Sequence, residues 1–235
     1  MAVPKYKRIL LKLSGEALAD SNGILNFDFI SSIAEVLKKC IDAGIEVGVI
    51  VGAGNIWRGR QGGEMNHTRA DHMGMLATTI NALALQDTFI QHGLDTVVMT
   101  AVEIKAFADP YTVRGAVDAL SKGKIVVLGC GLGSPYFSTD TAAALRAAEI
   151  EADAILMAKN IDGVYSADPR KDPNAVKYDE ITYAEMIAKE LGALDLTAAA
   201  FCMANGITSY AFELKDPMNI YRVAMGEKIG TELHK

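Results

Sequence analysis

The sequence predicts an α/β protein, a three-layer αβα sandwich with a mostly parallel central sheet. Strand-like runs alternate with segments of helical periodicity, which is the pattern of parallel strands joined by helical crossovers. After one charged residue at the start, the runs at 46–51 and 124–129 are apolar and rich in β-branched residues, as strands buried on both faces are. The five predicted strands lie at about 8–13, 46–51, 95–100, 124–129 and 154–158.

Two of the intervening segments have the apolar spacing of an amphipathic helix. Each is followed by a glycine, Gly44 or Gly93, which stops the helix. The apolar positions are Ile30, Ile33, Ala34, Leu37 and Ile41 in the first segment, and Leu76, Ile80 and Leu83 in the second.

The chain changes character after Ala158. Asp-Gly and Asp-Pro pairs at 162–163, 168–169 and 172–173 are turn signals, and they predict a loop region with a hairpin. Beyond it the pattern predicts helices at about 183–191 and 197–205, a strand at 209–214 and a short helix near 220–225. The sequence contains no internal repeat or linker, so we expect a single domain over 1–235.

Composition excludes several classes of protein. The 235 residues can bury one sizeable core, and the formal net charge of -6 argues against general affinity for nucleic acid or anionic membranes. Cys40, Cys130 and Cys202 are far apart among apolar neighbours, as reduced core cysteines are. Neither a signal peptide nor an 18-residue uncharged apolar run is recognisable. We therefore expect a cytoplasmic protein that does not bind membranes or nucleic acid.

Three of the predicted strands end in a glycine turn followed by polar or charged residues. Ser14 and Gly15 follow the first strand, residues 52–59 follow the second, and residues 131–135 follow the fourth. Such turns expose backbone N–H groups, and a helix beginning after one adds partial positive charge. Because the carboxyl ends of parallel strands meet at one edge of a sheet, the turns predict one crevice for anionic ligands.

Five motifs in and around these turns resemble the bacterial uridylate kinase family, which has the amino-acid kinase fold. They are KLSGEAL at 12–18, GAGNIWRG at 52–59, ADHMGMLAT at 70–78, PYFSTD at 135–140 and DGVYSADP at 162–169. The resemblance extends almost end to end and includes the tail at 222–231. The P-loop motif G-x-x-x-x-G-K-[ST] of other nucleotide kinases does not occur in the sequence.

The resemblance implies a transferase that uses ATP to phosphorylate UMP to UDP. It places the acceptor nucleotide in about 1–150 and ATP in about 151–235 of one amino-acid kinase-like domain. Mg²⁺ would be carried on the nucleotide, because the sequence has no dense carboxylate cluster to hold it. We therefore expect no metal site built from protein side chains.

Three residues are the candidates for the chemistry: Lys12, Arg58 and Asp140. Lys12 ends a strand rich in Ile and Leu, where a lysine is costly unless it meets an anion. The resemblance implies that Lys12 neutralises the transferred phosphoryl group, that Asp140 orients Lys12, and that Arg58 contacts phosphate. The alternatives are a lysine that reaches solvent, an aspartate that only caps a helix, and an exposed loop arginine.

The acceptor site implied by the resemblance centres on Asp71, whose carboxylate would accept from the ribose hydroxyls of UMP. Its alternative role is the N-cap of a helix beginning near His72. Leu132, Ser134 and Ala53 replace a usual threonine, asparagine and glycine, so we expect changed affinity rather than a changed substrate. The UMP-binding residues implied are Ala53, Asp71, Leu132, Gly133, Ser134, Pro135, Tyr136, Phe137, Ser138 and Thr139.

The donor site implied by the resemblance includes Tyr165, which could stack on adenine, and Asp168, which could accept from the sugar. Tyr165 could equally be plain strand packing. Whether Lys159 or Asn160 takes the adjoining position is open, and Lys159 could approach the phosphates. The ATP-binding residues implied are Lys12, Leu13, Ser14, Gly15, Gly54, Arg58, Asn160, Tyr165 and Asp168.

The resemblance also implies regulation and assembly. The segment 20–25, with Arg69 and Arg114, would form an effector region for GTP as activator and make subunit contacts, and UTP would inhibit. The chain would form a homohexamer with an interface near Met73 and Met75. The stretch at 20–23 fits an ordinary polar turn equally well. Two rival functions are phosphorylation of a carboxylate or carbamate by the same fold, and nucleotide sensing without turnover.

Overall fold

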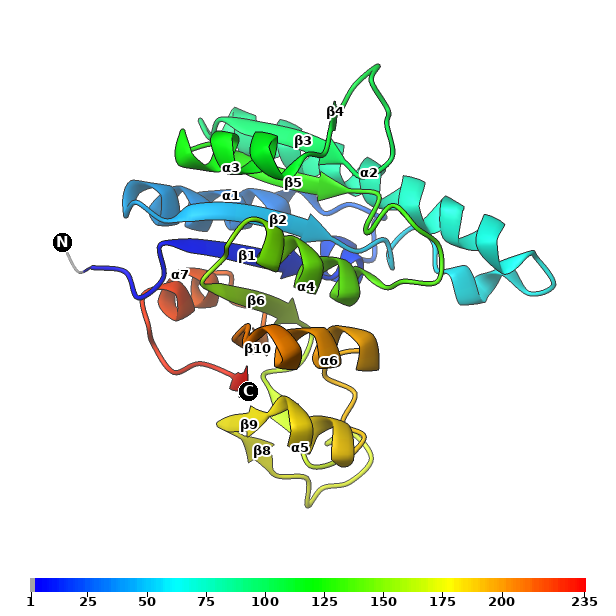
Figure 1. Cartoon of the computed structure of the whole chain (residues 1–235), viewed down its shortest axis with the longest axis vertical. Helices are drawn as coiled ribbons and strands as arrows, with labels where there is room; N and C mark the ends of the chain where they lie inside the picture. The colour runs from blue at the N-terminus through cyan, green and yellow to red at the C-terminus, as the bar shows by residue number, and fades with distance from the viewer. Residues whose placement is uncertain (1–2) are drawn as a thin grey trace.

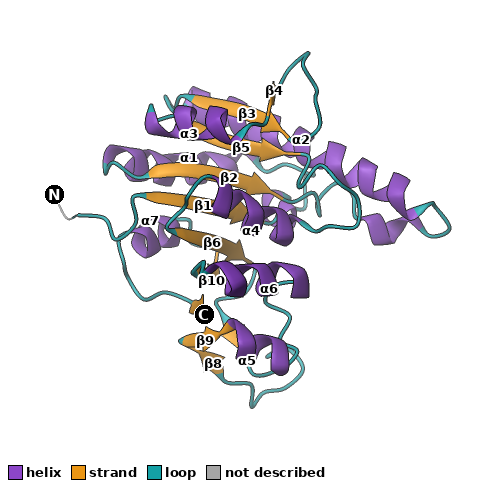
Figure 2. Ribbon diagram, viewed as in Figure 1, coloured by secondary structure: helices purple, strands orange, loops and turns teal. Residues whose placement is uncertain are grey.

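The computed structural model describes residues 3–235, without the side chains at positions 59 and 60. One large sheet forms its centre, with helices on both faces (Figure 1, Figure 2). The strands of this sheet are β1 (Arg8–Leu13), β2 (Glu46–Val51), β3 (Thr96–Thr100), β4 (Asp109–Pro110), β5 (Ile125–Gly129), β6 (Ala154–Lys159), β9 (Glu180–Thr182), β10 (Ser209–Glu213) and β11 (Thr231–His234).

The sheet has nine strands in the order β4-β3-β5-β2-β1-β6-β10-β11-β9, and all neighbours are parallel except β10 and β11. Strands β7 (Val164–Tyr165) and β8 (Lys177–Tyr178) form a separate antiparallel pair. The helices are α1 (Phe27–Asp42), α2 (His67–Gln91), α3 (Val113–Ser121), α4 (Thr139–Glu149), α5 (Tyr183–Ala188), α6 (Leu196–Asn205) and α7 (Met218–Ala224), with 3-10 helices η1 (Gly15–Leu18) and η2 (Gly59–Gly62). The predicted α/β fold with a mostly parallel sheet is confirmed.

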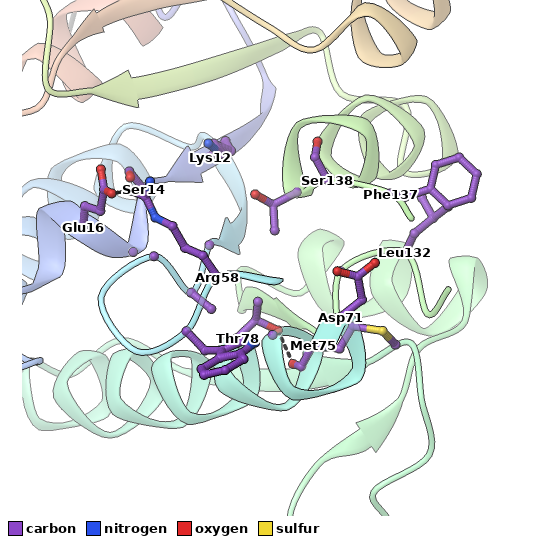
Figure 3. A pocket seen from close by; sticks show the side chains of 18 of the residues that line it. Lys12, Ser14, Glu16, Arg58, Asp71, Met75, Thr78, Leu132, Phe137 and Ser138 are labelled. Atoms are coloured by element: carbon purple, nitrogen blue, oxygen red, sulfur yellow. Dashed lines mark hydrogen bonds and ion pairs between the residues drawn. The ribbon is translucent and has the colours of Figure 1, made fainter. Parts of the chain in front are cut away.

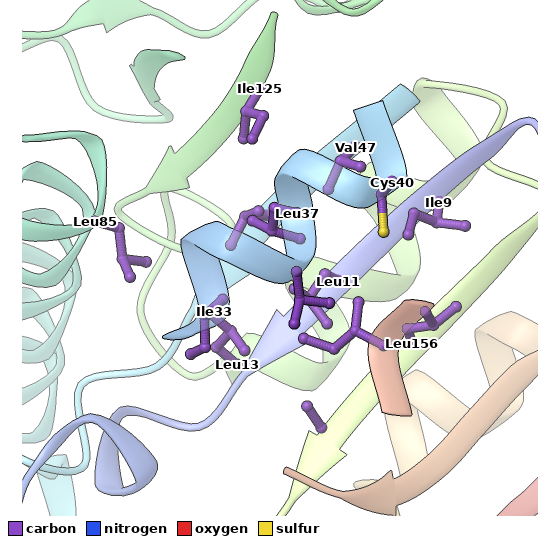
Figure 4. Close-up of a cluster of buried hydrophobic side chains, with 14 of the residues drawn as sticks. Ile9, Leu11, Leu13, Ile33, Leu37, Cys40, Val47, Leu85, Ile125 and Leu156 are labelled. Carbon is purple, nitrogen blue, oxygen red and sulfur yellow. The ribbon is translucent and has the colours of Figure 1, made fainter. Parts of the chain in front are cut away.

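Two apolar clusters, one on each face, hold the helices to the sheet. The first joins the sheet to α1, α2 and α7, and the second joins it to α3, α4, α5 and α6. Alternate residues of β1 supply them: Ile9 and Leu11 face α1 (Figure 4), whereas Leu10 faces the other way. Lys12 lies two residues after Leu10, so its side chain points to the same face of the sheet, the face that α4 covers.

The five strands predicted in the first two thirds of the chain are confirmed to within one residue at each end, and the predicted hairpin is β7–β8. The helix predicted before Gly93 is α2, but it does not bury the apolar positions from which it was predicted. Leu76 and Ile80 of α2 are 56% and 50% exposed, whereas Ala77, Ala82, Leu85 and Phe89 are buried. The helix therefore packs against the sheet with a different set of residues, and the stripe of Leu76 and Ile80 points outward.

The carboxyl ends of β1, β2, β5 and β6 lie at the same edge of the sheet, and α2 projects beyond them (Figure 1). Among residues 3–235, no helix is both long enough and apolar enough to cross a membrane.

Candidate active site

The first two glycine turns are in direct contact at this edge. A Cβ atom added at Gly15 would lie 2.5 Å from the carbonyl oxygen of Gly52 and 2.7 Å from the backbone nitrogen of Gly54. No side chain fits in that space, so glycine is required at position 15 for the turns after β1 and β2 to pack together. Their backbone amides are thereby gathered at the ends of two neighbouring strands.

A cavity of about 330 Å³, called here the first cavity, lies between these turns, the loop after β5 and the start of α2. Lys12, Ser14 and Glu16 lie at one end, Asp71, Leu132 and Phe137 at the other, and Arg58 between them (Figure 3). It is lined by several residues predicted to bind UMP: Ala53, Asp71, Leu132, Ser134, Phe137, Ser138 and Thr139. It is also lined by several predicted to bind ATP: Lys12, Ser14, Gly15, Gly54 and Arg58.

Lys12, which lines this cavity, forms an ion pair with Asp140, which lies behind the lining. Nζ of Lys12 lies 2.8 Å from Oδ1 of Asp140, and the two side chains are only 11% and 17% exposed. Burial alone would raise the pKa of Asp140, but the positive charges of Lys12 and Lys159 outweigh it and hold that pKa below its ordinary value. The carboxylate is therefore ionised throughout the neutral range, and Lys12 does not reach freely into solvent.

Asp140 does not cap α4, contrary to the alternative role considered for it. The N-cap is Ser138, whose hydroxyl accepts from the backbone N–H groups of Asp140 and Thr141. Since Asp140 is the second residue of the helix, its side chain is free to turn toward β1 and pair with Lys12.

Asp195 connects the start of α4 to the start of α6. Its carboxylate accepts from the hydroxyls of Ser138 and Thr141 and also caps α6 through the N–H of Ala198, 2.9 Å away. The hydroxyl of Ser138 is thus already donated within the protein. Sequence reasoning missed Asp195, although an aspartate just before a predicted helix is an N-cap signal.

Lys159 is the second lysine of the site, and its side chain is partly buried. It ends β6 with the parity of Met157, on the same face as Lys12, and its Nζ donates to the carbonyl oxygen of Ala193. Desolvation lowers its pKa, the charge of Asp140 opposes this, and the nearby Lys12 adds to the lowering. The structure therefore brings two lysines to one carboxylate.

Arg58 is paired with Glu16, which sequence reasoning did not single out. The two side chains form an ion pair across the first cavity, from the turn after β2 to η1. Both are partly exposed, so a phosphate entering the cavity could compete with the carboxylate for the guanidinium.

Asp71 lies inside α2 rather than at its N-cap. The helix begins at His67 and is capped by Asn66, whose side chain accepts from the backbone of Arg69. The expected alternative role for Asp71 is therefore wrong, and so is a helix beginning near His72. One turn into the helix, the carboxylate of Asp71 points into the first cavity (Figure 3).

A second cavity of about 530 Å³ meets the first at Lys12, Ser14 and Glu16 and continues to Lys159 and Asn160. A third, of about 360 Å³, shares Lys159 and contains Tyr165 and Asp168. The Tyr165 hydroxyl donates to Asp162 at 2.8 Å, and the guanidinium of Arg170 donates to both carboxylate oxygens of Asp168, at 3.0 and 3.2 Å.

Some predicted residues do not line these cavities, and some that line them were not predicted. Leu13 faces the apolar cluster beside α1, and Tyr136 is 68% exposed. Gly133 and Pro135 lie in the loop after β5 but outside the lining of the first cavity. The residues that line the first cavity without having been predicted as site residues are Glu16, Gly52, Trp57, Gly74, Met75, Thr78 and Gly131.

Comparison with known proteins agrees with this architecture. A UMP kinase from Bacillus anthracis matches with a TM-score of 0.94 and 35% identity over 97% of this chain and 96% of that one. A UMP kinase from Ureaplasma parvum matches with a TM-score of 0.92 and 36% identity over 98% of this chain and 100% of that one. A uridylate kinase from Archaeoglobus fulgidus matches with a TM-score of 0.74 and 29% identity over 96% of this chain and 99% of that one.

The sequence itself matches the family model described as "Amino acid kinase family" over residues 7–212. That range contains the sheet from β1 to β10, both lysines, Asp140 and all the predicted site residues. The protein therefore belongs to the amino acid kinase family.

Proposed function

We propose that the protein transfers the γ-phosphoryl group of ATP to UMP, giving ADP and UDP. The observation that carries this proposal is the position of Lys12, paired with Asp140 at the point where two cavities meet. A phosphoryl group passing between two nucleotides has to cross such a point, and a fixed cation there would neutralise its charge. The similarity to UMP kinases at 35% and 36% identity supports the choice of acceptor.

UMP would occupy the first cavity. Its volume of about 330 Å³ fits a mononucleotide, its far end is lined by apolar atoms of Leu132, Met75 and Phe137, and Asp71 can accept from the ribose. The phosphate would then lie toward Lys12 and Arg58. Because Leu132 offers no hydrogen bond, uracil would be read by backbone groups of its loop.

ATP would occupy the second and third cavities. Lys12 and Lys159 would flank its terminal phosphates, with Tyr165 and Asp168 near the nucleoside. Arg170 holds Asp168 in the present structure, so a ribose hydroxyl would have to share or replace that contact.

The chemical step needs no strong base, because the acceptor phosphate is already an anion. A phosphate oxygen of UMP forms a bond to the γ-phosphorus while the bond from that phosphorus to the β,γ-bridging oxygen breaks, and ADP leaves. Lys12 would neutralise the equatorial oxygens, and Asp140 would keep its ammonium charged and fixed. Positioning and electrostatic stabilisation supply most of the rate enhancement in such transfers.

We further propose that Mg²⁺ arrives with ATP. Among the described residues there is no group of three or more His, Cys, Asp or Glu side chains that could hold a metal ion, and Asp140 is paired with a lysine. Such a site fits an ion held mainly by phosphate oxygens. When bound with ATP, the ion would neutralise part of the negative charge on the phosphates.

The proposed function is tested by measuring ADP formation from ATP and Mg²⁺ with a panel of acceptors: UMP, CMP, GMP, glutamate, N-acetylglutamate, aspartate and carbamate. We expect turnover with UMP and little with the others. Turnover with a carboxylate or carbamate would assign a different acceptor, and binding of UMP without turnover would indicate a sensor.

A Lys159→Met variant should be more stable than the parent yet bind ATP more weakly. Because the pKa of Lys159 is lowered in the folded state, the unfolded chain binds its proton more tightly and the buried ammonium costs stability at neutral pH. We expect a higher Tm and a KM for ATP raised about tenfold. In the parent, stability should also rise with pH up to the ordinary lysine pKa, and the variant should lose that dependence.

Assembly and regulation remain proposals. Met73, Leu76 and Ile80 expose an apolar stripe along α2, which would suit the subunit contacts of the proposed hexamer. Asp20 accepts from the backbone of Asn22 and Gly23, the geometry of an ordinary turn, in the region proposed for GTP. We propose activation by GTP, inhibition by UTP and a cytoplasmic location on the resemblance alone.

A further inference from the structure

Two residues hold Asp71 in place, and neither of them lines the first cavity. The backbone N–H of Tyr136 donates to Oδ2 of Asp71 at 2.8 Å, and Nε2 of His67 lies 3.1 Å from the same oxygen. Within the described part of the chain, side chains at 59 and 60 aside, no hydrogen bond reaches Oδ1. The protein thus engages one carboxylate oxygen and leaves the other to the first cavity, which Asp71 lines.

The rings of His67 and Tyr136 also stack on each other. Their centroids are 4.5 Å apart with an interplanar angle of 21°, and the Tyr136 hydroxyl lies 3.5 Å from Oγ1 of Thr68. His67 is the first residue of α2, whereas Tyr136 belongs to the loop between β5 and α4. We call this pair the aromatic clasp, and it joins the two segments that border the far end of the first cavity.

Tyr136 adopts a backbone conformation that disfavours a bulky side chain. Its φ of 70° is in the left-handed region, which strains any residue with a Cβ atom. Burial does not explain it, because the side chain is 68% exposed. What the conformation achieves is to direct the N–H of Tyr136 at Asp71 while its ring meets His67.

We propose that the aromatic clasp is a positioning device for Asp71 and sets the preference of the acceptor site for ribose over deoxyribose. By fixing Oδ2 from two sides, it presents Oδ1 to a hydroxyl of the acceptor sugar. This inference rests on the proposed function. The bonds to the carboxylate oxygen are charge-assisted on the acceptor side, so a well-placed hydroxyl contributes more than a neutral hydrogen bond would.

The experiment compares His67→Ala with a matched control, His72→Ala. His72 is an exposed histidine in the same part of α2, next to Asp71 in sequence. KM and kcat are measured for UMP, 2′-deoxy-UMP and 3′-deoxy-UMP at saturating ATP and Mg²⁺. We expect the parent to disfavour at least one deoxy analogue about tenfold or more in kcat/KM.

In His67→Ala, the KM for UMP should rise about fivefold with kcat nearly unchanged, and the discrimination against that analogue should shrink toward one. His72→Ala should behave as the parent. His67→Gln should recover much of the discrimination, because its amide can still donate to a carboxylate four residues along the helix. If His67 only stabilised the fold by packing, His67→Gln would not recover the discrimination.

Three outcomes would overturn the inference while the proposed function stands: no discrimination by the parent, unchanged discrimination in His67→Ala, or an equal loss for all three nucleotides. Tyr136→Gly serves as a second variant, since it relieves the strain, keeps the N–H and removes the ring. It should fall between the parent and His67→Ala. A parent that phosphorylates none of the three acceptors would instead refute the proposed function.

Discussion

A Lys12→Ala variant should lose turnover by about a thousandfold while binding UMP almost as tightly as the parent. Lys12 is the one cation whose side chain lines both the first and second cavities among the described side chains, so its charge would act on the phosphoryl group in transit. Removing one preorganised group that stabilises transition-state charge typically costs a hundred- to a thousandfold in kcat, or about 3–4 kcal/mol. Steady-state ADP release gives kcat, and titration calorimetry without ATP gives the affinity for UMP.

The control for this variant is Lys38→Ala. Lys38 lies on the exposed side of α1 and pairs with Asp42 one turn away, an interaction that contributes at most a few tenths of a kcal/mol. Its removal should leave kcat and UMP affinity unchanged. If Lys12→Ala kept kcat within tenfold of the parent, another group would have to neutralise the phosphate.

Much of this site could be predicted because each cue lies within a short stretch of sequence. Lys12 is a charged residue in an apolar strand, and strand parity alone places it on one face of the sheet. Gly15, Gly52 and Gly54 follow strands whose ends have to meet. These local signals, with the motif resemblance, were enough to gather residues that line the first cavity.

The contacts between distant segments could not be predicted in this way. Asp195 reaches Ser138 across 57 positions, and Tyr136 reaches Asp71 across 65. Neither partner carries a pattern that specifies the other, because side-chain pairing across loops depends on how two helices are placed in space. The outward apolar stripe of α2 has a related cause: periodicity identifies a stripe but does not say which surface covers it.

An Asp140→Asn variant should lose both activity and stability. The change leaves Lys12 and Lys159 without their shared counter-charge, and breaking a buried ion pair by removing one partner costs about 3 kcal/mol. We expect kcat to fall at least a hundredfold, since Lys12 would no longer be fixed. Chemical denaturation gives the change in free energy of unfolding, and Asp118→Asn, which opens an exposed pair with Lys122, should change it little.

The pH dependence of stability tests the same ion pair, because the lowered pKa of Asp140 fixes the direction in which stability changes with pH. The pKa of Asp140 is lowered in the folded state. Its contribution to the free energy of unfolding is therefore complete above the unfolded carboxyl pKa of about 4, and it is lost as the pH falls through the pKa of the folded state. The parent should therefore lose this contribution in acid. Asp140→Asn should lack that part of the acid dependence, because it no longer has a carboxylate to protonate.

The double variant Lys12→Met/Asp140→Asn separates the two roles of the pair. Removing both charges takes away one of the two uncompensated ammonium groups, that of Lys12, and leaves Lys159, so the free energy of unfolding should recover part of what Asp140→Asn lost. Activity should not recover, because neither the phosphate-neutralising charge nor its orienting carboxylate remains. A double variant as unstable as Asp140→Asn would show that the carboxylate supports the fold through contacts other than Lys12, and the ion pair would then not be the reason for its burial.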